Sequence, residues 1–210
     1  MLLPALALAA PPGDPLPGRE KADTERCLEC HGAPAEGQGF STGSDGKFAR
    51  LGGQQYEYIV KQVKDFRSGK RKHEFMQMMA RTISDADLAD IAAYFAAQPP
   101  MPAATAPAPA TAPATALAAA PQHGNAAQLY AHGDPARKLP ACASCHGENG
   151  KGMAGVAPVI GGQGKAYLAQ QLHDWRNGSR KNSAGDVMNQ FSKPLSDAEI
   201  EALARYVSGM

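Results

Sequence analysis

The stretch that decides the fold reads Cys142-Ala143-Ser144-Cys145-His146, and a twin stands earlier in the chain as Cys27-Leu28-Glu29-Cys30-His31. A CxxCH pattern is typical of covalent haem attachment. Cysteines three residues apart lie on one face of a helical turn, where both thiols can add to the two vinyl groups of one haem. The histidine that follows lies on the same turn and can approach the iron. The sequence therefore predicts two covalently attached haems of the c type, one at each motif.

Two other chemistries use CxxC pairs: a redox dithiol like that of thioredoxin, and half of a zinc site, or one zinc shared by both pairs. Neither requires a histidine directly after the second cysteine, and both copies have one. All four cysteines of the chain lie in the two motifs, so none is left over for a disulfide. Covalent haem is the interpretation that also explains His31 and His146.

The length of 210 residues allows two small domains, and two haem motifs favour that division. Small domains bury little apolar surface by themselves, so we expect each half to fold around its cofactor. The net charge of +1 argues against a polyanionic partner such as nucleic acid. Residues 1–12 begin with a short apolar run that is interpreted as a signal-peptide remnant or a disordered N-terminus, because Ala7-Leu8-Ala9 fits a cleavage site.

An internal repeat organises the rest of the chain into a first unit, residues 18–98, and a second unit, residues 122–210. Apolar residues recur at helical spacing in both units, at Ile59, Val63 and Phe66 and again at Leu168, Leu172 and Trp175. Serine-led capping boxes at Ser84 and Ser196 precede a second apolar stripe in each unit. Residues 24–31 are also predicted to be helical, and residues 70–81 show no clear period.

The segment between the units, residues 99–121, is a predicted linker. Of its 23 residues 18 are proline or alanine, and none is charged. Such a run cannot build a core and favours an extended spacer. Strand signals are absent from both units. The sequence thus predicts an all-α protein, a tandem duplication of two haem domains joined by this linker.

The repeat also locates candidates for the second axial ligand of each iron. Counting back eight residues from the caps Ser84 and Ser196 gives Met76 and Met188. Met188 has no rival within its loop, whereas Met78 and Met79 compete with Met76. His73 is a further rival, but the second unit has no histidine at the matching place, and we expect His73, His123, His132 and His173 to be exposed in basic loops. Thioether ligation raises the reduction potential of a haem, which favours a high-potential carrier.

Arg71 and Arg180 recur in matched Arg-x-Gly-x-Arg segments. They are interpreted either as partners of haem propionates or of an acidic patch on another protein, or as members of ordinary solvated loops. The sequence leaves these alternatives open.

Taken together, these residues resemble the cytochrome c4 family, periplasmic proteins made of two class I cytochrome c domains. The resemblance rests on the second haem motif with Gly147, on Gly161-Gly162-Gln163 followed by Tyr167, on the run from Gln171 to Gly178, and on the Met188 loop. It implies a periplasmic location and a packed domain interface. It also implies that the carbonyl of Pro158 accepts a hydrogen bond from His146, and the first unit has Ala49 in place of this proline.

The resemblance implies a dihaem electron carrier without catalysis of its own, which takes electrons from a quinol-oxidising complex and delivers them to a terminal oxidase or another acceptor. Its expected partners are redox proteins, with possible peripheral association with the membrane. The alternatives are the cytochrome subunit of a larger dehydrogenase and a dihaem peroxidase. A methionine available in each unit argues against the peroxidase, which needs an open iron.

Overall fold

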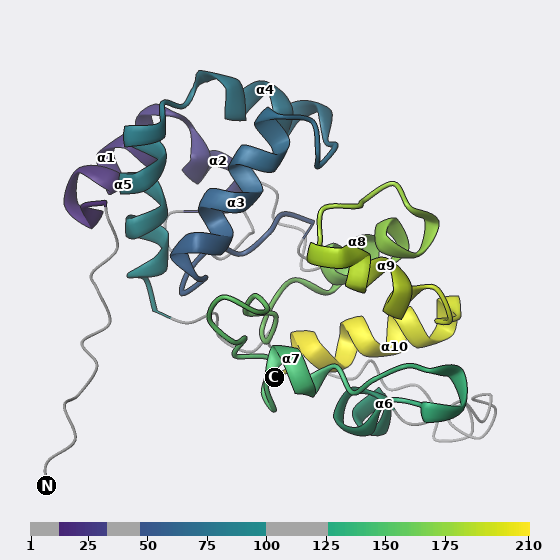
Figure 1. Cartoon of the computed structure of the whole chain (residues 1–210). Coiled ribbons are helices and arrows are strands. Elements are labelled where there is room, and N and C mark those ends of the chain that lie inside the picture. The colour runs from purple at the N-terminus through teal and green to yellow at the C-terminus, as the bar shows by residue number, and fades with distance from the viewer. Residues whose placement is uncertain (1–12, 33–46, 100–125) are drawn as a thin grey trace, which may run out of the picture.

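The computed structural model of the chain describes residues 13–32, 47–99 and 126–210 (Figure 1). The expected N-terminal segment 1–12 and all but the first residue of the expected linker lie outside the described residues. The first domain contains α1 (Pro15–Thr24), α2 (Cys27–His31), α3 (Tyr56–Arg67), α4 (Glu74–Thr82) and α5 (Asp85–Ala96). The second contains α6 (Ala126–His132), α7 (Ala143–His146), α8 (Lys165–Asn177), α9 (Val187–Ser192) and α10 (Asp197–Ser208), with short 3₁₀ turns at Pro135–Arg137 and Ala184–Asp186.

The predicted all-α architecture is confirmed for the described residues, which contain only two isolated bridges, Asp134 with Leu139 and Met153 with Ala157. The helices expected from the apolar stripes are α3 and α8, and those behind the serine caps are α5 and α10. Ser196 accepts a hydrogen bond from the backbone of Glu199, and Glu199 returns one to the backbone of Ser196. Ser84 caps α5 in the same way, but without the reciprocal bond. No helix of the described residues is long and apolar enough to cross a membrane.

Four helices, α1, α4, α6 and α9, are not predicted by the sequence patterns. Residues 70–81 show no clear apolar period, yet α4 begins at Glu74, where the ring of His73 caps the backbone N–H of Met76. The expected helix 24–31 is divided, since α1 ends at Thr24 and Arg26 takes a left-handed φ of 59° before α2 begins. Short helices of this kind are fixed by caps and packing rather than by a long apolar period.

Each domain has its own apolar core, and in each the last helix packs on the first. In the first domain α1 and α5 are so close that the backbone of Asp90 occupies the space where a side chain on Gly18 would begin. In the second domain Tyr130 on α6 is buried and its ring lies against that of Tyr206 on α10. Figure 1 shows the two domains side by side, with α3 of the first and α8 of the second lying toward the boundary between them.

Candidate haem sites and the domain interface

The first CxxCH motif forms α2, which ends at Gly32 with a φ of 81°. The chain therefore turns away directly after His31. Nδ1 of His31 donates a hydrogen bond to the backbone carbonyl of Ala49 at 2.7 Å. Burial lowers the pKa of His31, so the ring is neutral. A proton on Nδ1 leaves the lone pair of Nε2 available for a metal.

The second motif forms α7 and repeats this arrangement. Gly147 follows with a φ of 77°, and its carbonyl accepts a 2.6 Å hydrogen bond from the hydroxyl of the buried Tyr130. Nδ1 of His146 donates to the carbonyl of Pro158 at 3.0 Å, as the resemblance implied. Burial lowers the pKa of His146 as well. Because the acceptor is a backbone carbonyl in both domains, the alanine at position 49 serves as well as the proline at 158.

None of the four cysteines forms a disulfide. Burial raises the pKa of Cys27 and of Cys142 to about 11, opposite to the lowered pKa that makes a redox dithiol reactive. The two pairs belong to different domains, and no three His, Cys, Asp or Glu side chains of the described residues gather as a metal site. The arrangement therefore fits two separate haem attachments better than a dithiol or a shared zinc site.

The candidate methionines lie on α4 and α9. Met76 and Met79 are half-buried on α4, whereas Met78 has 55% of its surface exposed. Met188 is half-buried on α9, where its backbone N–H donates to the hydroxyl of Ser183 at 3.2 Å. His73 is exposed as expected, but His173 is not in a loop: it lies within α8 and is half-buried beside Arg176.

A set of reciprocal hydrogen bonds joins the two domains. The side chain of Gln163 accepts from the backbone N–H of Arg50 at 2.7 Å and donates to the carbonyl of Arg50 at 3.1 Å. The side chain of Gln54 makes the same two bonds to the backbone of Val159, at 3.1 and 2.9 Å. Gln54 and Gln163 are matching positions of the repeat, as are Arg50 and Val159. The interface therefore has an approximate two-fold axis inside one chain.

The two arginines of the matched segments cross this interface. Arg71 donates to the hydroxyl of Tyr167 at 3.0 Å and to the side-chain oxygen of Gln171 at 2.7 Å. Arg180 donates to the hydroxyl of Tyr58 at 3.2 Å and to the side-chain oxygen of Gln62 at 3.0 Å. Both arginines are buried, with 8% and 6% of their surface exposed. The interpretation of these segments as solvated loops is therefore wrong, and burial equally removes them from contact with another protein.

These buried cations lack an anionic partner among the described residues. The acceptors that face Arg71 and Arg180 are amide and hydroxyl oxygens, and neither guanidinium makes an ion pair with a carboxylate there. Burial alone would raise the pKa of the Tyr167 hydroxyl, but the charges of Arg71 and Arg180 outweigh it and lower that pKa. Buried charges are normally compensated. Haems carry carboxylates, so they would supply the anions that these two buried cations lack. The residues present therefore fit a haem.

A few contacts break the two-fold symmetry. The side-chain amide of Asn182 donates to Asp65 at 2.6 Å and to Gln62 at 3.0 Å, while Lys61 donates to the backbone carbonyl of Asn182 at 2.7 Å. The position that matches Asn182 in the first domain is His73, which stays exposed. These contacts attach the loop before α9 to the surface of α3.

Arg71, Arg180 and Gln163 stand out in the sequence, but nothing in the linear pattern assigns them to a contact face between the domains. The signal present in the sequence is a glutamine at the same place on both interface helices, Gln62 on α3 and Gln171 on α8. The side-chain oxygen of each of these glutamines accepts hydrogen bonds from both Arg71 and Arg180. That the two units touch, however, depends on tertiary structure that a linear pattern does not contain.

The chain is similar in sequence to known cytochromes. The cytochrome c family model matches the chain twice, over residues 16–99 and 125–210. Cytochrome c4 of Pseudomonas aeruginosa is 38% identical over 99% of this chain and 93% of its own length. A thiosulfate dehydrogenase electron acceptor of Stutzerimonas stutzeri is 36% identical over 88% of this chain and 78% of its own.

A solved structure resembles the whole molecule. The crystal structure of reduced recombinant cytochrome c4 from Pseudomonas stutzeri superposes with a TM-score of 0.76 and 33% sequence identity. The match covers 94% of this chain and 99% of that one, so it includes both domains.

Proposed function

This chain belongs to the cytochrome c family as a dihaem cytochrome of the c4 type, an electron-transfer protein with two covalent haems c, and on that premise we propose that it carries electrons between periplasmic redox complexes, from a quinol-oxidising complex to a terminal oxidase. The observation that carries the proposal is the pair of equivalent histidine sites in domains joined by a reciprocal interface. Such an interface fixes the distance between two redox centres, as a two-electron shuttle requires.

We assign the axial ligands within this proposal. His31 and Met76 ligate the first iron, and His146 and Met188 ligate the second. Cys27 and Cys30 attach the first haem, and Cys142 and Cys145 attach the second. The haem iron supplies reversible one-electron chemistry when bound. The carbonyls of Ala49 and Pro158 hold the imidazole rings in one orientation, and Arg71 and Arg180 place positive charge between the domains.

The proposal also covers what surrounds these sites. The domains comprise residues 18–98 and 122–210, with residues 99–121 as the linker between them. Export to the periplasm follows from the place where c-type haem is attached in this family. Both irons are then six-coordinate and unreactive toward small ligands.

Ligation at both irons is tested by the visible spectrum of the reduced holoprotein with and without carbon monoxide. Two six-coordinate irons leave that spectrum unchanged at neutral pH, and the protein does not turn over hydrogen peroxide. A carbon monoxide adduct at one haem, together with peroxide turnover, would instead establish the dihaem peroxidase.

A second candidate function is favoured by the relative named a thiosulfate dehydrogenase electron acceptor. In that case this chain accepts electrons from a thiosulfate-oxidising dehydrogenase, which is a form of the dehydrogenase-subunit alternative. The oxidised holoprotein is mixed with a purified thiosulfate dehydrogenase and thiosulfate, and in parallel with a quinol-oxidising bc1 complex and quinol. Rapid reduction in the first mixture alone identifies the sulfur route, and rapid reduction in the second alone identifies the quinol route.

A further inference from the structure

We infer that Asp65 and Lys61, two residues of the first domain, are positioning residues for the second haem site, because they hold the loop that carries Met188. Ligation of the second iron then depends on a docked first domain, whereas ligation of the first iron does not depend in this way on the second domain. The inference rests on the proposed ligands Met76 and Met188 and adds a structural difference between the two sites.

The anchor of this loop is Asn182, which has 8% of its surface exposed. Its side-chain amide donates to the carboxylate of Asp65 at 2.6 Å and to Gln62 at 3.0 Å, and its side-chain oxygen accepts from Nε of Arg180 at 2.9 Å. Both amide protons and the oxygen thus have a partner. A buried amide satisfied in this way favours one orientation, so it fixes the backbone to which it is attached.

Asp65 is held in turn by its own domain. It lies on α3, one turn after Lys61, whose ammonium group donates to the Asp65 carboxylate and, at 2.7 Å, to the backbone carbonyl of Asn182. Only 10% of the Asp65 side chain is exposed, against 47% of the Lys61 side chain. Hydrogen bonds to a charged group are stronger than those between neutral groups, and a buried carboxylate that loses a partner is costly. These two residues therefore bind the loop of the second domain firmly to α3.

The residues that follow Asn182 connect this attachment to the proposed ligand. The hydroxyl of Ser183 accepts from the backbone N–H of Met188 at 3.2 Å. The side-chain amide of Asn189 donates to the carbonyl of Arg180 at 2.8 Å. The first turn of α9 is therefore bonded to the segment that the first domain holds.

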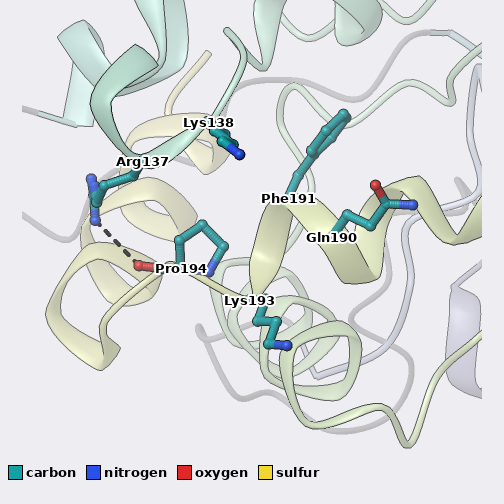
Figure 2. A pocket seen from close by; sticks show the side chains of 6 residues that line it. All are labelled: Arg137, Lys138, Gln190, Phe191, Lys193 and Pro194. Carbon is teal, nitrogen blue, oxygen red and sulfur yellow. Dashed lines mark hydrogen bonds between the residues drawn. The ribbon is translucent and has the colours of Figure 1, made fainter.

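The helix α9 is too short to fix its own position. It has six residues and packs against α8 and the 3₁₀ turn Ala184–Asp186. On another side it borders a hollow of about 350 Å³, which is lined by Arg137, Lys138, Gln190, Phe191, Lys193 and Pro194 (Figure 2). Short helices depend on caps and packing for their stability, so the anchor at Asn182 matters for where Met188 lies.

The first domain has no equivalent attachment. The position that matches Asn182 is His73, which is exposed. Its ring accepts from the backbone N–H of Met76 at 3.3 Å, so α4 is capped within its own domain. Asp174 on α8 matches Asp65, but its carboxylate accepts two hydrogen bonds from side chains of its own domain and, among the described residues, none from the first domain.

The test follows the sulfur-to-iron band of one haem at a time. In the oxidised Met76→Ala holoprotein the near-infrared band reports Met188 alone, and in the Met188→Ala holoprotein it reports Met76 alone. Guanidinium chloride is added to each, and the equilibrium constant for loss of the band is measured at one fixed concentration. If either protein lacks the band before guanidinium is added, the ligand assignment fails and the inference fails with it.

In these two backgrounds, Asp65→Leu should raise the equilibrium constant for loss of the Met188 band about tenfold or more, and that for the Met76 band less than about twofold. A residue that only stabilised its own domain would do the opposite, because Asp65 and Met76 belong to the same domain. Lys61→Met changes a half-exposed side chain that folding tolerates, and it should act in the same direction by about threefold. Asp65→Asn keeps an oxygen that can accept from Asn182, so most of the effect of the leucine should disappear.

The matched control is Asp174→Leu, the same change at the matching position of the second domain, and it should alter the Met76 band less than about twofold. Three results would each overturn the inference: an effect of Asp65→Leu on the Met76 band as large as that on the Met188 band, no effect of Asp65→Leu on either band, or a tenfold effect of Asp174→Leu on the Met76 band. The carbon monoxide experiment tests ligation in the unaltered protein, so failure of the positioning role is distinguished from failure of the carrier function.

Discussion

Where the two domains face each other they repeat most of their contacts in both directions, and where they face solvent they differ. Gln54 and Gln163 each pair with the backbone of the opposite domain, whereas Asp23 occupies the outer position that Lys138 has in the second domain. A contact across a two-fold axis constrains both copies of a repeat at once, because each side chain meets the other copy. A residue on the outer surface contacts no residue of the other domain, so it can differ between the two copies. The duplication can thus keep one inner geometry and carry two different outer surfaces.

The largest expected effect comes from removing the proposed sulfur ligand in either domain. Met76→Ala and Met188→Ala should each lower the potential of one haem, on the order of 100 mV, and abolish its near-infrared sulfur-to-iron band. Met79→Ala and Phe191→Ala are the matched controls and should leave the band in place. Spectroelectrochemistry of the four variants makes the comparison. Loss of the band in Met79→Ala alone would show that the repeat had been aligned wrongly.

A smaller change in potential is expected from the buried arginines. Arg71→Leu and Arg180→Leu each remove a cation near the domain boundary. Loss of this positive charge stabilises the oxidised haem, so the reduction potentials should fall by on the order of 50 mV. Arg71→Lys is the control, since it keeps the charge but loses the forked hydrogen bonds to Tyr167 and Gln171. If the leucine variants leave both potentials unchanged, the arginines do not serve the haems electrostatically.

The two domains should differ in how strongly acid destabilises them, because different ion pairs hold the last helix of each. Arg137 lowers the pKa of Glu199 to about 2 from 4.5, so this pair stabilises the fold above pH 4.5 and the contribution is lost as the pH falls toward 2. Glu199→Gln should cost about 1–2 kcal/mol at pH 7. Denaturant unfolding at pH 7 and pH 3 measures this, and the cost should shrink at pH 3.

The matched change in the first domain is Asp87→Asn. Lys21 lowers the pKa of Asp87, but this pair is exposed, so its loss should be the smaller one. A cost equal to that of Glu199→Gln would contradict the distinction drawn between the two pairs.

The smallest expected effect concerns the carbonyls that orient the histidines. Pro158→Ala should leave the potential of the second haem unchanged, because Ala49 already shows that a backbone carbonyl suffices. Redox titration is the measurement. A clear shift would mean that the proline ring itself, and not its carbonyl, sets the position of His146.

The haem motifs, the duplication and the long helices were predictable because each depends on residues close together in sequence. Ser84 and Ser196 marked two helix starts, and the apolar stripes marked the helices α3, α5, α8 and α10. The short helix α4 was missed because its cap is a histidine, His73, which is rarely read as one. The interface was missed because Gln54 and Val159 are brought together only by folding. Arg71 and Arg180 stand out in the sequence because they recur in matched segments, but their burial could not be seen from their polar surroundings.

The central claim is that the two haem domains act as one carrier through their shared interface. The direct measurement is to introduce a protease site within residues 100–121, cleave the folded holoprotein there, and compare it with the uncut protein by size-exclusion chromatography and redox titration. The interface described above predicts that the cut halves elute together at the size of the intact protein, with both potentials unchanged. Halves that separate on the column and titrate as two independent carriers would contradict the claim.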